Sequence, residues 1–328
     1  MPLITDFTAS TLTAAINKFP VQWGRINQMG LFSDEGVRTR DVTIEQLVGS
    51  LAILDSHEWG GNGTVAAAED RQIVPLHIPQ TVHADKVLPA DVQDIRAFGS
   101  DNDLETIEAV VARRLQRMRA KHDITLEWRR MGALKGAVTN AGGGTIVDLF
   151  TAFGVTQVAV DFDLGTSTTD VRAKCESVVD QIEDNIGDDV MTGVHALVSK
   201  TFWQKLITHA NVEKFYVNWQ NAAMLTDGGT RRGFTFGGIT FEEYRANTNG
   251  TSFIADGDGH AFPLGTTNTF STYYAPADFN ETVNTLGLPF YAKVRQTEFE
   301  RGYELHTQSN SLPICKRPAV LVRLYSST

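Results

Sequence analysis

The chain has 328 residues, of which 42% are hydrophobic and 21% are charged, a composition typical of a folded globular protein. The formal net charge of −10 disfavours tight binding of nucleic acid, because the mean electrostatic field repels phosphate groups. The sequence has no run of about 18 apolar residues and no basic and apolar start of the kind found in secretory signals, so we expect neither a membrane span nor secretion.

Residues 1–35 are predicted to form an N-terminal arm that contains one short amphipathic stretch, Thr11–Phe19, before Pro20. A segment this close to a terminus is ordered only where another surface holds it. From Val37 onward, β-branched residues alternate with charged ones, and a second extended run follows at Arg71–Val82. These two runs predict a long two-stranded excursion.

The segment between the two runs predicts a turn at the far end of this excursion. Trp59 is followed there by four residues that favour tight turns, Gly60, Gly61, Asn62 and Gly63. In the second run, Pro75 and Pro79 exclude a helix and favour an edge strand. A lone hairpin is only marginally stable in water, so we expect the tip formed by residues 59–63 to contact a neighbouring copy.

The longest helix signal begins near Asn102, whose spacing from Glu105 is that of a capping box. Apolar residues then recur every three or four positions as far as Leu134. They predict a helix over about 102–136 that is about 50 Å long. The apolar pattern changes phase near His122, which predicts a bend or a change of packing partner at that point.

The predicted helix carries eight basic residues. A solvent-exposed basic face is the simplest interpretation of this pattern. The alternative is an inner surface of an assembly that meets DNA or another acidic partner. The candidate residues for such a face are Arg113, Arg117, Arg129 and Arg130.

Two strand-like runs follow, 145–155 and 156–164, and together they predict a hairpin. The second run leads into Asp163–Thr168, DLGTST, which resembles the phosphate-binding turn of actin-like ATPases and sugar kinases. That turn needs a strand on both sides, whereas the residues after Thr168 have helical spacing. Thr168 or Thr169 is expected to cap this helix. We therefore expect a strand, a turn and a capped helix, with an ATP site as the alternative.

Other motifs give little indication of catalysis or metal binding. The eight histidines include no pair at the helical spacing of zinc sites, and Asp256–Thr267 matches only part of a calcium-binding loop. Cys175 and Cys315 lie far apart in the sequence and predict two inert, buried thiols rather than a disulfide framework. We expect no cofactor, no metal ion and no catalytic residue.

From Met191 the sequence predicts a compact α/β region. Its expected elements are a strand at 193–199, a helix at 200–210 and an aromatic hairpin that turns at Gly237 and Gly238. The end of the chain, 318–326, is nearly all apolar. A terminal segment of this kind is usually paired inside a sheet.

The third quarter and the end of the chain resemble a known family. The similar residues lie in two long stretches, 252–293 and 304–322, and include the blocks FPLG, YAPAD, VNT, QSN and LPIC. These blocks are ordered and collinear with the lambda-type major capsid protein E family of tailed bacteriophages. The layout of the first half is also similar to that family, so the resemblance covers nearly the whole chain.

The resemblance implies the Hong Kong 97 phage capsid fold, an α+β fold. That fold has an N-terminal arm, an extended loop (the E-loop), a peripheral domain with a long spine helix, and an axial domain. The expected division is an arm at 1–35, an E-loop at 36–82, a peripheral domain at 83–187, an axial domain at 188–288 and a return to the peripheral sheet at 289–328.

The resemblance also implies a structural and non-enzymatic function. Copies of the chain would form hexamers and pentamers of an icosahedral phage shell that encloses double-stranded DNA and binds it only weakly. Scaffolding, portal and decoration proteins would be further partners, with no membrane involved. The shell would assemble in the host bacterial cytoplasm and become part of the virion. An encapsulin-like compartment and an actin-like phosphotransferase are the alternatives.

Overall fold

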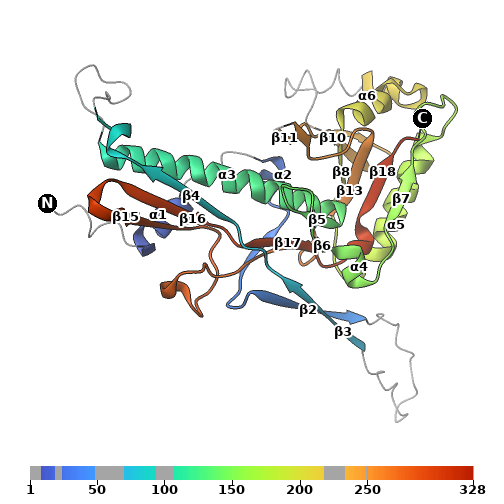
Figure 1. Cartoon of the computed structure of the whole chain (residues 1–328). Helices are drawn as coiled ribbons and strands as arrows, with labels where there is room; N and C mark the ends of the chain where they lie inside the picture. Colours follow the sequence, from blue (N-terminus) through green and yellow to red (C-terminus); the bar gives the residue numbers. More distant parts are fainter. Residues whose placement is uncertain are drawn as a thin grey trace, which may run out of the picture.

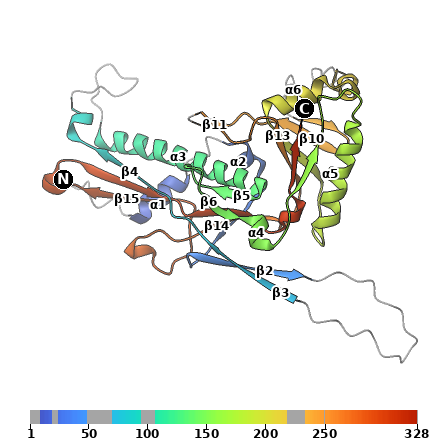
Figure 2. The same ribbon diagram turned by 45° about the vertical axis from the view of Figure 1, so that its right-hand side comes forward.

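The computed structural model describes residues 9–18, 24–48, 70–93, 106–217, 233–248 and 250–327. One long helix crosses the molecule, with a three-stranded sheet along its N-terminal half and a six-stranded sheet beyond its C-terminal end (Figure 1). A two-stranded segment extends away from the body (Figure 2). The described chain therefore has two lobes joined by a helix, and one projection.

The long helix is α3, Ile107–Lys135. It begins where Thr106 Oγ1 accepts a hydrogen bond from Ala109 N at 3.2 Å. It ends at Gly136, which has a left-handed φ of 85° and no room for a Cβ beside the ring of Phe150. The cap predicted at Asn102 lies outside the described residues, and the predicted end near 136 agrees with the structure.

The helix packs against two separate hydrophobic clusters. Its N-terminal half contributes buried residues to a small cluster, namely Val110, Val111, Leu115 and Met118. Its C-terminal half contributes Met131, Ala133 and Leu134 to the main core. His122 lies between the two sets, so the predicted change of packing partner near this residue is confirmed.

The three-stranded antiparallel sheet has the order β15-β16-β4. Its strands are Tyr291–Gln296, Tyr303–Gln308 and Val82–Val87, in that order. The first helix, α1 (Ala9–Lys18), packs on β15 and buries Leu12 and Ile16 in the small cluster. The predicted amphipathic stretch is thus a helix, and this part of the predicted arm is folded on its own subunit.

A second three-stranded sheet holds the rest of the N-terminal segment. It has the order β1-β14-β17, in which β1 is parallel to β14. The bounds are Ser33–Gly36 for β1, Phe270–Tyr274 for β14 and Ser311–Cys315 for β17. The short helix α2, Arg25–Met29, contacts α3.

The six-stranded sheet has the order β7-β18-β13-β8-β10-β9. Its strands are Val158–Asp161, Val322–Tyr325, Asp258–Leu264, Gly193–Val198, Ile239–Glu243 and Phe234–Phe236, in that order. Two helices pack on it, α5 (Val171–Ile186) and α6 (Lys200–Thr208). The strand, helix and aromatic hairpin predicted after Met191 are confirmed as β8, α6 and β9–β10.

The last four strands of the chain lie in three different sheets. β18 pairs with β13 and β7, so it lies inside the six-stranded sheet. Residues 289–328, predicted to return to the peripheral sheet, thus contribute β15 and β16 to the sheet with β4, β17 to the sheet with β14, and β18 to the six-stranded sheet. The prediction that the apolar end of the chain is paired inside a sheet is confirmed.

The hairpin predicted over 145–164 is wrong. Residues of β6, Thr145–Asp148, pair instead with β5, Ala137–Thr139. A short helix, α4 (Leu149–Phe153), follows because the side chain of Asp148 caps it. The second run forms β7, which pairs in parallel with β18 at the far end of the sequence.

The two-stranded projection consists of β2, Asp41–Val48, and β3, Asp70–His77, in antiparallel pairing. Pro75 is accommodated because each strand of a two-stranded sheet has a free edge. Along these strands Val42, Ile44, Val74 and Leu76 are buried and join the main core. The predicted tip, Trp59 to Gly63, lies outside the described residues.

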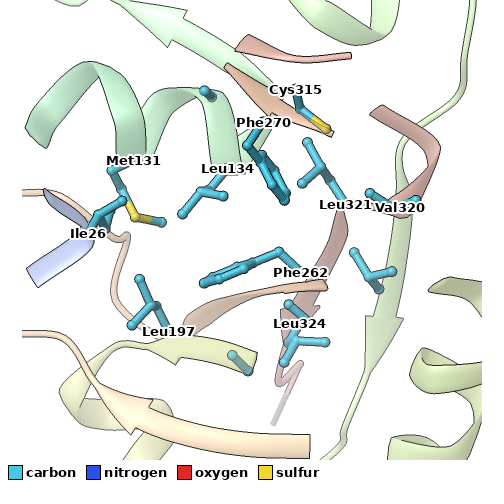
Figure 3. Close-up of a cluster of buried hydrophobic side chains, with 14 of the residues drawn as sticks. Ile26, Met131, Leu134, Leu197, Phe262, Phe270, Cys315, Val320, Leu321 and Leu324 are labelled. Atoms are coloured by element: carbon cyan, nitrogen blue, oxygen red, sulfur yellow. The ribbon is translucent and has the colours of Figure 1, made fainter. Parts of the chain in front are cut away.

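The main core lies between α3 and the six-stranded sheet. Figure 3 shows Met131 and Leu134 of α3 facing Leu197 and Phe262, with Cys315 at the edge of the cluster. Both cysteines are free and buried, as the sequence predicted, and burial raises the pKa of each thiol to about 12. The remaining short elements are η1 (Pro89–Asp91), β11 (Asn247–Thr248), β12 (Thr251–Ser252), η2 (Asn280–Thr282), η3 (Glu298–Glu300) and η4 (Pro318–Val320).

Candidate functional site: surfaces for subunit assembly

The segment Asp163–Thr168 is a closed turn between β7 and α5. Thr166 and Thr169 donate their hydroxyl hydrogens to the carboxylate of Asp163, at 3.0 and 3.3 Å. Asp170 caps α5 by accepting hydrogen bonds from the backbone amides of Arg172 and Ala173, so the expectation of a cap at Thr168 or Thr169 is wrong. A helix follows the turn where a phosphate-binding turn of the actin type needs a strand.

Metal and ligand sites have little support in the described part of the chain. No group of three His, Cys, Asp or Glu side chains there could hold a metal ion. Among the same residues, no helix is long and apolar enough to cross a membrane. A cavity of about 210 Å³ lies between α1, α2 and α3, but Arg119 and Asp123 in its lining are already paired with each other at 2.9 Å. Small-molecule sites are usually larger, about 300–1,000 Å³.

A buried carboxylate on α3 holds the N-terminal segment in place. Glu127 accepts hydrogen bonds from the backbone amides of Ile26 at 2.8 Å and Asn27 at 2.9 Å, and from the hydroxyl of Tyr244 at 2.8 Å. Gly24 lies so close that a Cβ there would be 2.4 Å from Glu127 Oε2. Burial raises the pKa of Glu127, and the two amide hydrogen bonds oppose the rise.

A second buried carboxylate joins the same segment to the six-stranded sheet. Glu242 on β10 accepts two hydrogen bonds from the guanidinium of Arg25, at 2.7 and 3.0 Å, and lies 3.2 Å from His195 Nε2. Burial alone would raise the pKa of Glu242, but the contacts with His195 and Arg25 outweigh it and lower the pKa to about 2. These contacts fix α2 on the subunit by charged hydrogen bonds.

The predicted basic face of the long helix does not extend over its C-terminal half. Arg129 is buried and donates hydrogen bonds to Ser311 O and to Thr81 Oγ1, at 3.0 and 2.6 Å. Arg130 is also buried, and its guanidinium lies 2.6 Å from Asp34 Oδ1. Burial lowers the pKa of Arg129 to about 10. These two residues connect elements within the subunit and form no outer surface.

The other two candidates, Arg113 and Arg117, are exposed on the N-terminal half of α3. Basic residues next to them have local partners, since Arg114 pairs with Asp85 and Asp91 at 3.1 Å. A surface that could meet an acidic partner is thus limited to this half of the helix. Sequence spacing could not separate the two halves, because arginine occupies exposed and buried positions alike.

Residues suited to subunit contact lie at the ends and projections of the molecule. On the β2–β3 projection Ile73 is 61% exposed, although the next residue, Val74, is buried in the core. A long projection of this kind leaves hydrogen-bonding edges and apolar side chains for another chain to cover. The geometry therefore suits binding between macromolecules better than chemistry on a small substrate.

Comparisons with known proteins identify the family of the chain. The family model of the phage major capsid protein E matches residues 8–326. The chain belongs to this family. The major capsid protein of Pseudomonas phage KPP10 is 29% identical over 98% of this chain and 97% of its own length. The major capsid protein of Salmonella phage Felix O1 is 28% identical, over 96% and 95%.

Solved structures show the fold. A protein from a prophage of Escherichia coli CFT073 matches with a TM-score of 0.59 and 13% identity, over 97% of this chain and 99% of that one. The mature capsid of bacteriophage PhiM1 matches with a TM-score of 0.54 and 12% identity, over 95% and 89%. The chain has the predicted Hong Kong 97 phage capsid fold. Its family is structural, which excludes the phosphotransferase alternative.

Proposed function

We propose that this chain is the major capsid protein of a tailed phage. Its copies form the hexamers and pentamers of an icosahedral shell that encloses double-stranded DNA. The observation that carries the proposal is the family match over residues 8–326, together with a body from which β2 and β3 extend (Figures 1 and 2). Closed rings need one surface to fit a different surface on the next copy, and a projection supplies such a surface.

The parts of the fold have distinct roles in this proposal. The β2–β3 projection is the E-loop, and α3 is the spine helix of the peripheral domain. The six-stranded lobe is the axial domain, which surrounds the axis of each ring. The exposed Arg113 and Arg117 form a limited inner face that meets packaged DNA weakly, because the chain as a whole carries a formal charge of −10.

Scaffolding, portal and decoration proteins are the further partners in this proposal. The shell assembles in the cytoplasm of the host bacterium and then forms part of the virion. An encapsulin-like compartment is the second candidate, because it is built on the same fold. The contents of purified particles separate the two, since a phage head contains DNA and a compartment contains protein.

Negative-stain electron microscopy with size-exclusion chromatography and light scattering tests the proposal directly. We expect closed shells, or hexamers and pentamers, from the purified chain or from the chain produced together with the other head proteins of its phage. A chain that stays monomeric under both conditions contradicts the proposal.

The predicted E-loop tip has its own test. We expect Trp59→Ala to lower the yield of particles while the subunit still folds, because the proposal assigns the tip to a contact between subunits. The matched control is Val190→Ala. It truncates a side chain that is 68% exposed in the loop between α5 and β8. Equal particle yields for both variants contradict a role for the tip.

A further inference from the structure

The turn between β15 and β16 presents an aromatic side chain to solvent. Phe299 lies in η3 and is 87% exposed, more than any other large apolar side chain of the described residues. Phe299 and Glu300 have φ values of 59° and 56°, in the left-handed region that bulky residues rarely adopt. Outliers of this kind gather at functional sites.

Backbone hydrogen bonds close the turn that carries this ring. Thr297 N donates a hydrogen bond to Gly302 O at 2.9 Å, and Glu300 N donates one to Thr297 O at 3.1 Å. The guanidinium of Arg301 lies 5.8 Å from the ring centroid of Phe299. We call residues 298–300 the acidic tip, because Glu298 and Glu300 flank Phe299 in the sequence and both are exposed. The acidic tip is thus an exposed apolar projection flanked in the sequence by two glutamates, with the guanidinium of Arg301 next to the ring.

A second exposed apolar surface lies on the loop between β14 and β15. Its residues are Val283, Leu286 and Leu288, which are 65%, 57% and 43% exposed; we call them the apolar patch. The loop is anchored, because Gly287 N donates to Val37 O at 2.9 Å and Leu288 N donates to the hydroxyl of Tyr291 at 2.8 Å. The apolar patch is therefore held in place on the subunit.

Positive charge borders the apolar patch. Arg38 directly follows Val37, the residue that anchors the loop, Arg40 lies two positions further along, and both are exposed. Arg40 lies 3.7 Å from Asp278, but both side chains are more than 70% exposed, and exposed pairs of this kind are weak. We call Arg38 and Arg40 the basic border. Its charge is opposite to that of the acidic tip.

The acidic tip and the apolar patch of one subunit cannot meet. They lie at opposite ends of β15, whose six residues span about 20 Å. A contact between them therefore needs two copies of the chain, and it joins different surfaces on each copy. Contacts of this heterologous type close into rings or join one ring to the next.

We propose that the acidic tip of one copy docks on the apolar patch of a second copy, with Phe299 covered by the patch and its glutamates facing the basic border. The proposal rests on the proposed function, because it requires assembled copies. It assigns the partner of two surfaces that are exposed in the free subunit. Apolar burial supplies the affinity, and the opposite charges select the register.

Cross-linking in assembled particles tests the contact. We expect the double variant Phe299→Cys with Leu286→Cys to form covalent dimers and longer oligomers with a short bismaleimide, as seen on a denaturing gel. Each single variant is expected to stay mainly monomeric. The two native cysteines are buried and should not react. The matched control pairs Phe299→Cys with Val190→Cys, an exposed position in the other lobe.

The outcomes separate the two proposals. Particles of normal shape that give no more cross-linking at 299 and 286 than the control overturn the contact and leave the shell function intact. A wild-type chain that forms no particles contradicts the shell function itself. Cross-linking of Phe299→Cys alone, at the level of the double variant, also overturns the contact, because it would place two acidic tips together.

A charge exchange provides a second test. We expect Glu298→Lys with Glu300→Lys to lower the yield of particles roughly tenfold, because like charges then face each other. Adding Arg38→Glu and Arg40→Glu is expected to restore most of the yield. Particle counts by electron microscopy measure both effects. A charge-reversed tip that assembles like the wild type, or that the exchanged border does not rescue, overturns the proposal.

Discussion

The two lobes at the ends of α3 are stabilised in different ways. In the six-stranded lobe, the ring of Phe162 packs edge-to-face on Phe202 at 5.5 Å and on Phe241 at 6.3 Å, and all three are fully buried. The other lobe, formed by β15, β16, β4 and α1 and called here the three-stranded lobe, has a small apolar cluster. It also has exposed ion pairs, such as Arg295 with Glu304 at 2.6 Å. Exposed pairs contribute little to stability.

This difference shows how one subunit can combine a rigid part with an adaptable one. The six-stranded lobe has a closed aromatic core, and movement within it would expose large apolar surfaces. The three-stranded lobe depends partly on α1, which docks on the edge strand β15 and contributes Leu12 and Ile16 to the small cluster. Changes of contact during assembly therefore disturb the second lobe at a lower free-energy cost.

The largest effect is expected from truncation in the six-stranded lobe. We expect Phe262→Ala to lower the free energy of unfolding by about 3–5 kcal/mol, because it leaves a cavity in a closed core. Phe262 is fully buried among residues of α3 and the sheet. Denaturant unfolding followed by circular dichroism measures the change. Phe299→Ala, at a highly exposed position, is the control, and equal losses for both variants would contradict the contrast between the lobes.

A smaller effect is expected from the matching change in the three-stranded lobe. We expect Ile16→Ala to lower the free energy of unfolding by about 2 kcal/mol, the lower end for such a change, because α1 can move to fill the space. Limited proteolysis should cut between α1 and α2 sooner than in the wild type, while the six-stranded lobe stays resistant. Ile107→Ala, at a half-exposed position of α3, is the control.

The pH dependence of stability should separate the middle of α3 from the six-stranded lobe. His122 Nε2 lies 3.0 Å from Thr307 Oγ1, and burial together with nearby positive charge lowers its pKa from 6.5 to about 4. A folded-state pKa below the unfolded one gives stability that is present above pH 6.5 and is lost as the pH falls through about 4. His122→Gln should remove this loss.

Glu242 contributes to stability over a lower pH range than His122 does. Its pKa falls from 4.5 to about 2 in the folded state, so its contribution is present above pH 4.5 and is lost as the pH falls toward 2. We expect Glu242→Gln to make the free energy of unfolding less dependent on pH in this range. The loss of stability caused by His122 between pH 6.5 and about 4 should not change. Urea midpoints measured from pH 7 to pH 2 check both variants. A change in the upper window for Glu242→Gln would contradict the separation.

The smallest effect is expected at the surface of the three-stranded lobe. Arg295 is 78% exposed in its ion pair with Glu304. We expect Arg295→Ala to change the free energy of unfolding by less than about 1 kcal/mol, because solvent screens the pair. Raising the salt concentration should nearly abolish this small difference in the free energy of unfolding between variant and wild type. A loss comparable to that of Ile16→Ala would show that ion pairs stabilise this lobe.

Features that depend on local spacing could be predicted from the amino-acid sequence alone. The apolar period of α3, its phase change near His122, and the alternate aromatics of β9 and β10 all appear within a few neighbouring residues. The resemblance in residues 252–322 also indicated the family and the fold. Hydrophobic periodicity reports which side of an element is buried, so these predictions needed no partner to be known.

Which distant segments meet could be seen only in the folded chain. β7 pairs with β18, which lies at the other end of the chain, and α1 docks on β15. It also decided that Arg129 and Arg130 are internal while Arg113 and Arg117 are exposed. An arginine is stable in either place, provided that a buried guanidinium has hydrogen-bond partners. Those partners come from Thr81, Thr272 and Ser311, and only folding brings them to the helix.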